Sequence, residues 1–171
     1  MELFEYGELL GLLVPSGAEY IAMDKDYIYI FGDEPKFRKT DDDSCVWKSD
    51  KCLGWMKYWN DFIDLDYITS PDTQRVDWSR AWAKVTAKPW KEPRTFQTWA
   101  ESLDCIDAFW ARYATYCNGR MEMWGQEPFL ENGEWKRKDG RRPTATIYAP
   151  EDMILFRPGE ERKYRFSVTA E

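Results

Sequence analysis

A small group of acidic side chains offers the most direct chemistry in the first half of the chain. Asp24 and Asp26 stand two residues apart in a predicted turn, and Glu34 follows the next predicted strand. Carboxylates grouped in this way can hold a divalent cation, which would support a metal-dependent hydrolase. Tight turns also use aspartate for local hydrogen bonds, so a turn without a metal is the alternative interpretation.

A basic cluster in the second half predicts anion binding. Residues 136–142 read Lys-Arg-Lys-Asp-Gly-Arg-Arg, with Asp139-Gly140 as a turn signal. Several cations at one hairpin tip suit a phosphate, a nucleotide or an acidic protein surface. In the nucleotide hypothesis, aromatic rings stack on the base while Arg137, Arg141 or Arg142 holds the phosphate. The alternative is a hairpin end that only keeps the protein soluble.

Acidic loops with tryptophan nearby predict a protein-binding surface. Residues 1–75 hold 16 acidic and 8 basic residues, although the whole chain has a net charge of only −7. Acid can steer a basic partner surface, and tryptophan is a common contact anchor. The alternative is that the ten tryptophans form the core and the acids maintain solubility. The predicted binding residues of this surface are Asp33, Glu34, Asp41, Asp42, Asp43, Trp47, Trp55 and Trp59.

Several other chemistries find no support in the residue types. The chain has no histidine, which removes Ser-His and Cys-His nucleophiles and histidine metal ligands. Cys45, Cys52, Cys105 and Cys117 lack the close pairs of a structural zinc site. No glycine-rich phosphate loop is present. We therefore expect no cofactor and no conventional acid–base or nucleophilic enzyme. The net negative charge also disfavours general binding to duplex nucleic acid.

The elements that position these residues predict an α+β fold. Apolar residues from Phe96 to Tyr113 recur every three or four positions, which predicts one long amphipathic helix over about 96–113. Residues 20–23 and 27–31 predict a β-hairpin. Short strands are expected at 46–47, 121–124, 134–136, 144–148, 153–156 and 164–168, whereas the segment 52–59 favours neither helix nor strand.

The chain contains an internal sequence repeat and a proline-rich linker. Residues 31–37, Phe-Gly-Asp-Glu-Pro-Lys-Phe, match residues 124–130, Trp-Gly-Gln-Glu-Pro-Phe-Leu, and a Trp-Lys pair follows each copy. This order predicts one β unit used twice. Two prolines within residues 88–94 mark a linker. We expect an acidic aromatic β module over 1–88 and a helix with a second β module over 95–171, which together can also form one compact domain.

Residues Tyr20-Ile21-Ala22-Met23-Asp24 are followed by an aromatic strand that ends at Phe31 and by Glu34-Pro35, with Trp47 and Asp77-Trp78 further along the chain. Through these residues the segment 15–82 resembles a module of small uncharacterised proteins of tailed bacteriophages. The glycine usual after the turn is replaced by Tyr27. The resemblance implies a phage origin and a small β module.

The resulting functional hypothesis is a phage-encoded accessory protein that evades host defence. It would bind a host or anti-phage defence protein stoichiometrically in the bacterial cytoplasm and so inhibit it. The alternatives are a nucleotide-binding or small-anion-binding protein that acts as a sponge, the metal-dependent hydrolase, and a minor virion structural protein. No apolar run is long enough to cross a membrane, and the acidic start of the chain disfavours a secretory signal.

Overall fold

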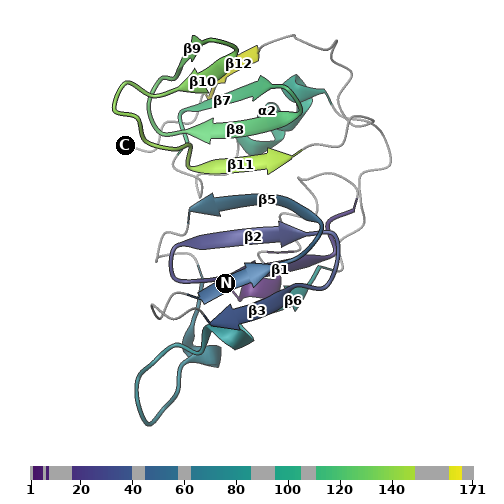
Figure 1. Cartoon of the computed structure of the whole chain (residues 1–171), viewed down its shortest axis with the longest axis vertical. Coiled ribbons are helices and arrows are strands. Elements are labelled where there is room, and N and C mark those ends of the chain that lie inside the picture. The colour runs from purple at the N-terminus through teal and green to yellow at the C-terminus, as the bar shows by residue number, and fades with distance from the viewer. Residues whose placement is uncertain are drawn as a thin grey trace. The chain divides into compact units, whose positions relative to one another are not determined.

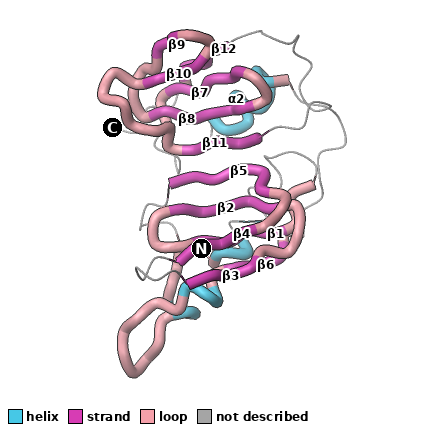
Figure 2. Tube along the Cα trace, viewed as in Figure 1, coloured by secondary structure: helices cyan, strands magenta, loops and turns pink. Residues whose placement is uncertain are grey.

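A computed structural model describes residues 2–5, 7, 17–39, 45–57, 63–85, 95–104, 111–148 and 162–166. The chain divides into two compact units, Met1–Pro89 (unit 1) and Trp90–Glu171 (unit 2). Strands dominate the described residues of both units, as Figure 2 shows. The element labels below follow Figure 1.

Unit 1 is built on four antiparallel strands in the order β5-β2-β1-β6. The predicted hairpin is confirmed: β1 (Tyr20–Met23) pairs with β2 (Tyr27–Phe31), with Tyr20 opposite Phe31. The segment that the sequence left undecided contains β5 (Cys52–Lys57), which pairs with β2. The edge strand β6 (Trp82–Lys84) pairs with β1. Two short 3₁₀ helices, Asp66–Ile68 and Trp78–Arg80, precede β6.

A second hairpin in unit 1 packs its aromatic side chains on the sheet. It consists of β3 (Lys36–Lys39) and β4 (Cys45–Lys48), with Phe37 opposite Trp47. Trp47 joins Ala22 and Phe31 in a buried cluster. Its indole N–H donates to the carbonyl oxygen of Met23 at 2.9 Å, so the buried nitrogen is satisfied. This bond ties the second hairpin to strand β1.

Unit 2 is built on four antiparallel strands in the order β11-β8-β7-β12. Strands β7 (Tyr113–Cys117) and β8 (Arg120–Trp124) form a hairpin, with Tyr113 opposite Trp124. Strand β11 (Ala145–Tyr148) pairs with β8, and β12 (Arg162–Arg165) pairs with β7. The small hairpin of β9 (Phe129–Glu131) and β10 (Glu134–Lys136) lies between β8 and β11 in the chain.

The predicted α+β class with one long helix is wrong. Helix α2 spans only Phe96–Asp104, and Tyr113, the expected last residue of the long helix, begins strand β7. The first turns of the predicted helix do pack as expected, because Phe96 and Trp99 are buried and the Phe96 ring lies 6.1 Å from that of Tyr116 on the sheet. The chain is mainly β, with α2 as a short cover on the sheet of unit 2.

The two units repeat one topology. In each unit a hairpin is followed by a Gly-x-Glu-Pro segment, a smaller hairpin, and one strand on either side of the first hairpin. The pair Tyr20–Phe31 corresponds to the pair Tyr113–Trp124, and both positions differ by 93 residues. The same shift aligns Gly32-Asp33-Glu34-Pro35 with Gly125-Gln126-Glu127-Pro128. Every position of the first hairpin therefore has a known counterpart in the second.

The duplicated architecture also repeats a long-range hydrogen bond. In unit 1 the Trp47 indole donates to the carbonyl of Met23, and in unit 2 the Trp135 indole donates to the carbonyl of Tyr116 at 3.4 Å. Met23 and Tyr116 are counterparts under the 93-residue shift. Corresponding elements make the same indole-to-carbonyl hydrogen bond in both units. The repeat in the sequence therefore reflects one structural unit used twice.

Three of the short strands predicted in unit 2 are confirmed. The strand expected at 134–136 is β10, and those expected at 121–124 and 144–148 are β8 and β11, whose bounds differ by one residue. The strand expected at 153–156 lies outside the described residues, whereas β12 covers part of the expected 164–168. Among the described helices, none has the length and hydrophobicity needed to cross a membrane.

Candidate functional site

The predicted acidic surface of unit 1 is only partly accessible as a site. Trp47 is 5 % exposed and belongs to the core cluster. Asp33 accepts hydrogen bonds from the Ser49 hydroxyl and from the backbone N–H of Lys51, which fixes the chain after β2. Glu34 is exposed and Trp55 is half-buried on the sheet. Asp41, Asp42, Asp43 and Trp59 lie outside the described residues.

The predicted metal ligands do not form a metal site. The Asp24 carboxylate is buried and accepts three hydrogen bonds, from the N–H groups of Asp26 and Tyr27 and from the Tyr29 hydroxyl, each at 2.9 Å. Its oxygens are thus occupied by the turn between β1 and β2. Among the described residues, which include Asp24, Asp26 and Glu34, no three acidic or cysteine side chains are placed to hold a metal ion.

A pocket in unit 2, with a volume of about 320 Å³, brings together several of the residues predicted to bind an anion. It is lined by residues from β8, from β10 and from the loop that joins β10 to β11: Arg120, Glu122, Trp124, Glu134, Trp135, Lys136, Arg137, Gly140, Arg141, Arg142 and Pro143. The three arginines predicted to hold an anion lie together here. Five cationic and two acidic residues line this pocket, so the sum of their charges is positive.

The basic residues lie in a connecting loop rather than at a hairpin tip. Strand β10 pairs with β9 and β11 pairs with β8, so residues 137–144 cross from the small hairpin to the main sheet. Asp139 organises this loop: its carboxylate accepts from the Arg137 guanidinium at 2.6 Å and from the Arg141 N–H at 3.1 Å. The Arg141 N–H and the charge of Arg137 hold the pKa of Asp139 below its usual value.

Arg137 has a donor that no described group satisfies. Its side chain is 11 % exposed, and its Nε atom is buried without a hydrogen-bond partner in the structure. A buried N–H of a guanidinium loses the water it would bind in the unfolded chain, which costs free energy unless an acceptor replaces it. Exposed Arg141 and Arg142 line the same pocket. Because the Nε atom of Arg137 is closed to solvent, an anionic ligand in the pocket would bond to the exposed guanidinium groups of Arg141 and Arg142.

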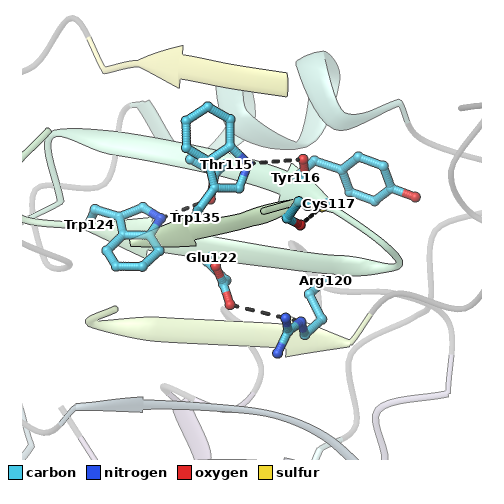
Figure 3. A network of polar contacts seen from close by, with 8 residues as sticks. Thr115, Tyr116, Cys117, Arg120, Glu122, Trp124 and Trp135 are labelled. Atoms are coloured by element: carbon cyan, nitrogen blue, oxygen red, sulfur yellow. Dashed lines mark hydrogen bonds and ion pairs between the residues drawn. The ribbon is translucent and has the colours of Figure 1, made fainter. Parts of the chain in front are cut away.

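Two tryptophans give the pocket its aromatic surface. Trp124 is buried, and its indole N–H donates to the Thr115 hydroxyl at 2.8 Å, whereas Trp135 is half-buried and donates to the carbonyl of Tyr116 (Figure 3). Both rings are therefore held by their polar atoms. The Lys163 ammonium lies 5.9 Å from the Trp135 ring centre. Trp135, with the more accessible ring, is the residue best placed to stack on a planar ligand.

One acid, Glu122, belongs to the central strand of the sheet beneath this pocket. It lies opposite Thr115 on β7 and Thr146 on β11, and its carboxylate is 4.0 Å from Arg120 Nε (Figure 3). The side chain is only 13 % exposed. Burial raises the pKa of Glu122, the charge of Arg120 lowers it, and the charge of Glu134 raises it again.

The corresponding positions in unit 1 carry aromatic rings. Arg120 and Glu122 correspond to Tyr27 and Tyr29 under the 93-residue shift, and Trp124 corresponds to Phe31. In unit 1 the Tyr29 and Phe31 rings stack with centres 5.9 Å apart, and the Tyr27 ring packs against Trp55. The lining of the pocket in unit 2 thus differs from its counterpart, since charged side chains stand where unit 1 has tyrosines.

Sequence reasoning found the basic loop but missed the other half of the site. Lys136 belongs to the predicted basic cluster, but Arg120, Glu122 and Trp124 were not predicted as binding residues, and Trp135 was noticed only as part of the repeat. The useful signal was the repeat itself, because aligning the copies shows tyrosines replaced by charges on one strand.

Comparison of the chain with protein-family models, with curated proteins and with solved structures finds no match.

Proposed function

We propose that this protein binds a phosphorylated small molecule in the pocket of unit 2. The observation that carries the proposal is the convergence of Arg120, Lys136, Arg137, Arg141 and Arg142 on one small pocket that also contains two indole rings. Guanidinium groups bind phosphate through paired, charge-assisted hydrogen bonds. Asp139 holds the guanidinium of Arg137, which also lines the pocket, in place through a hydrogen bond of 2.6 Å.

The same chemistry gives the phage hypothesis a concrete form. A phage-encoded protein that holds a phosphorylated host molecule would act stoichiometrically, as a sponge, and would need no catalytic residue. The protein-partner hypothesis has less support, since Trp47 is a core residue and Asp33 is engaged by its own chain. Small-molecule capture through the pocket of unit 2 is therefore our preferred function.

The test is calorimetric titration with pyrophosphate and with nucleoside mono- and diphosphates. We expect Arg141→Ala with Arg142→Ala to weaken binding by about tenfold or more, because each exposed cation contributes a charge-assisted bond to phosphate. Binding should also weaken as salt rises. A bound ligand at 100 times its dissociation constant should stabilise the fold by about 2.7 kcal/mol.

The matched control removes two exposed arginines from unit 1, Arg75→Ala with Arg80→Ala. It changes the net charge of the chain by the same amount but leaves the pocket intact. Equal affinity in the two double variants, or no binding by any of these phosphates, would overturn the proposal.

A further inference from the structure

Glu122 is out of place in a pocket that serves only to bind phosphate. A carboxylate repels an anion, and this one is largely buried in the middle of the sheet, where removing a charge from water is costly. Its partner Arg120 is 4.0 Å away, which is an ion pair and too long for a hydrogen bond. Glu122 therefore retains acceptor capacity that faces the pocket it lines.

A ligand that suits both kinds of side chain must carry two kinds of group. The arginines of the loop require an anion, whereas the ionised carboxylate of Glu122 can only accept hydrogen bonds. The ligand must then present N–H donors at some distance from its phosphate. Trp135, half-buried in the same lining, favours a planar ring as the part that carries the donors.

We propose that the ligand is a guanine nucleotide, with the guanine edge bound by Glu122, the ring stacked on Trp135 and the phosphate held by Arg137, Arg141 and Arg142. This inference rests on the proposed function of the pocket. The pocket volume of about 320 Å³ is within the usual range of small-molecule sites, which begins at about 300 Å³.

The choice of guanine follows from the geometry of a carboxylate. Its two oxygens accept two parallel donors, and guanine alone among the common bases has adjacent donors, the ring N1–H and the exocyclic amine. Adenine and cytosine place a ring acceptor beside the amine, so one carboxylate oxygen would face a lone pair. Hypoxanthine keeps N1–H but lacks the amine. A site built for two donors discriminates strongly against a ligand that leaves one oxygen unpaired.

Burial also favours a ligand that brings donors. The raised pKa of Glu122 means that the empty pocket disfavours the ionised carboxylate, and its causes are burial and the nearby charge of Glu134. Two N–H groups from a bound base would compensate for the lost water. The half-satisfied acid then becomes a fully hydrogen-bonded one, which is the arrangement that buried charges require.

The experiment compares four probes by titration calorimetry: GMP, IMP, AMP and inorganic phosphate. With the unaltered protein we expect GMP to bind at least about tenfold more tightly than IMP or AMP, the effect of one lost bond to a charged group. Glu122→Gln keeps the size of the side chain but replaces one acceptor by a donor. This variant should bind GMP and IMP with similar affinity, and it should bind inorganic phosphate at least as tightly as the unaltered protein does, because a charge that repels the anion is removed.

The control is Glu101→Gln, which changes an exposed acid on α2 outside the pocket and should keep the preference for GMP. Equal affinity of the unaltered protein for GMP, IMP and AMP overturns the guanine inference but leaves the phosphate site standing. Equal weakening of all four probes in Glu122→Gln also overturns it, because the acid would then act only by orienting Arg120. Failure of every probe to bind refutes the proposed function itself.

Discussion

Asp24 illustrates how a residue that suggests catalysis can serve the backbone instead. Its carboxylate is buried at the turn of the first hairpin and accepts from two backbone N–H groups and from the Tyr29 hydroxyl. Such a turn satisfies donors that would otherwise be buried without a partner. Two aspartates in a turn look the same in the sequence whether they stabilise the turn or bind a metal ion. Only the hydrogen-bond partners in the structure distinguish the two roles.

The contact between Tyr29 and Asp24 predicts a pH dependence of stability. Burial and the negative charge of Asp24 raise the pKa of Tyr29 above its usual value of 10.0. The folded protein therefore holds this proton more tightly than the unfolded chain does. Stability from this group is complete below pH 10 and declines as the pH rises further, because the unfolded state then releases the proton more readily.

The measurement is the melting temperature from about pH 9 to 11 for the unaltered protein and for Tyr29→Phe. We expect the unaltered protein to lose more stability over this range than the variant, since all other ionisable groups are shared. Near pH 8 the variant should be less stable by about 1 kcal/mol, the typical value of one hydrogen bond. Parallel curves for the two proteins would contradict the prediction.

At the scale of elements, the hairpins were predictable where local and long-range signals agreed. Tyr27 to Phe31 alternate aromatic and β-branched residues beside a turn rich in aspartate, and the hairpin forms as expected. The hairpin of β7 and β8 was missed because Tyr113 and Tyr116 continue the three-residue spacing of the apolar residues in the helix that begins at Phe96. Asn118 and Gly119, which join its two strands, both have positive φ (49° and 74°), the geometry of a tight hairpin turn.

The two small hairpins are attached by equivalent tryptophan hydrogen bonds of unequal length, which predicts unequal mutational effects. Trp47 is buried with a bond of 2.9 Å, whereas Trp135 is half-buried with a bond of 3.4 Å. We expect Trp47→Phe to destabilise the protein by about 2 kcal/mol, from the lost bond and the lost packing volume. Trp135→Phe should cost less than about 1 kcal/mol.

Urea denaturation of both variants tests this difference. A cost for Trp135→Phe equal to or above that for Trp47→Phe would show that the length and burial of the bond do not determine its contribution. The comparison is well matched, because the two substitutions are chemically identical and occupy corresponding places in one topology.

At the scale of the whole molecule, the repeat makes unit 1 a natural reference for unit 2. Glu122 corresponds to Tyr29, which the same sheet accommodates in unit 1. The variant Glu122→Tyr should therefore fold, with a melting temperature close to that of the unaltered protein, and should fill the pocket. We expect phosphate-containing ligands to bind at least about tenfold more weakly, because the ring takes the place of the ligand and the pocket loses volume.

Calorimetry and thermal denaturation of this variant give independent results. Undiminished binding in a folded Glu122→Tyr protein would place the ligand elsewhere.

The candidate site was predictable from the sequence only in its loop, since Arg137, Arg141 and Arg142 are close together in the chain. The remainder could not be predicted because Arg120 and Trp135 come together only when β8 and β10 are in place.

The bond between Trp124 and Thr115 makes two positions of the sheet depend on each other. Unit 1 has Phe31 and Ala22 at the corresponding positions, a pair without polar atoms in its side chains. With alanine at position 115 the buried indole N–H of Trp124 would have no acceptor, and with phenylalanine at position 124 the Thr115 hydroxyl would lose its donor. The two side chains therefore contribute to stability as one coupled pair, whose substitutions are non-additive.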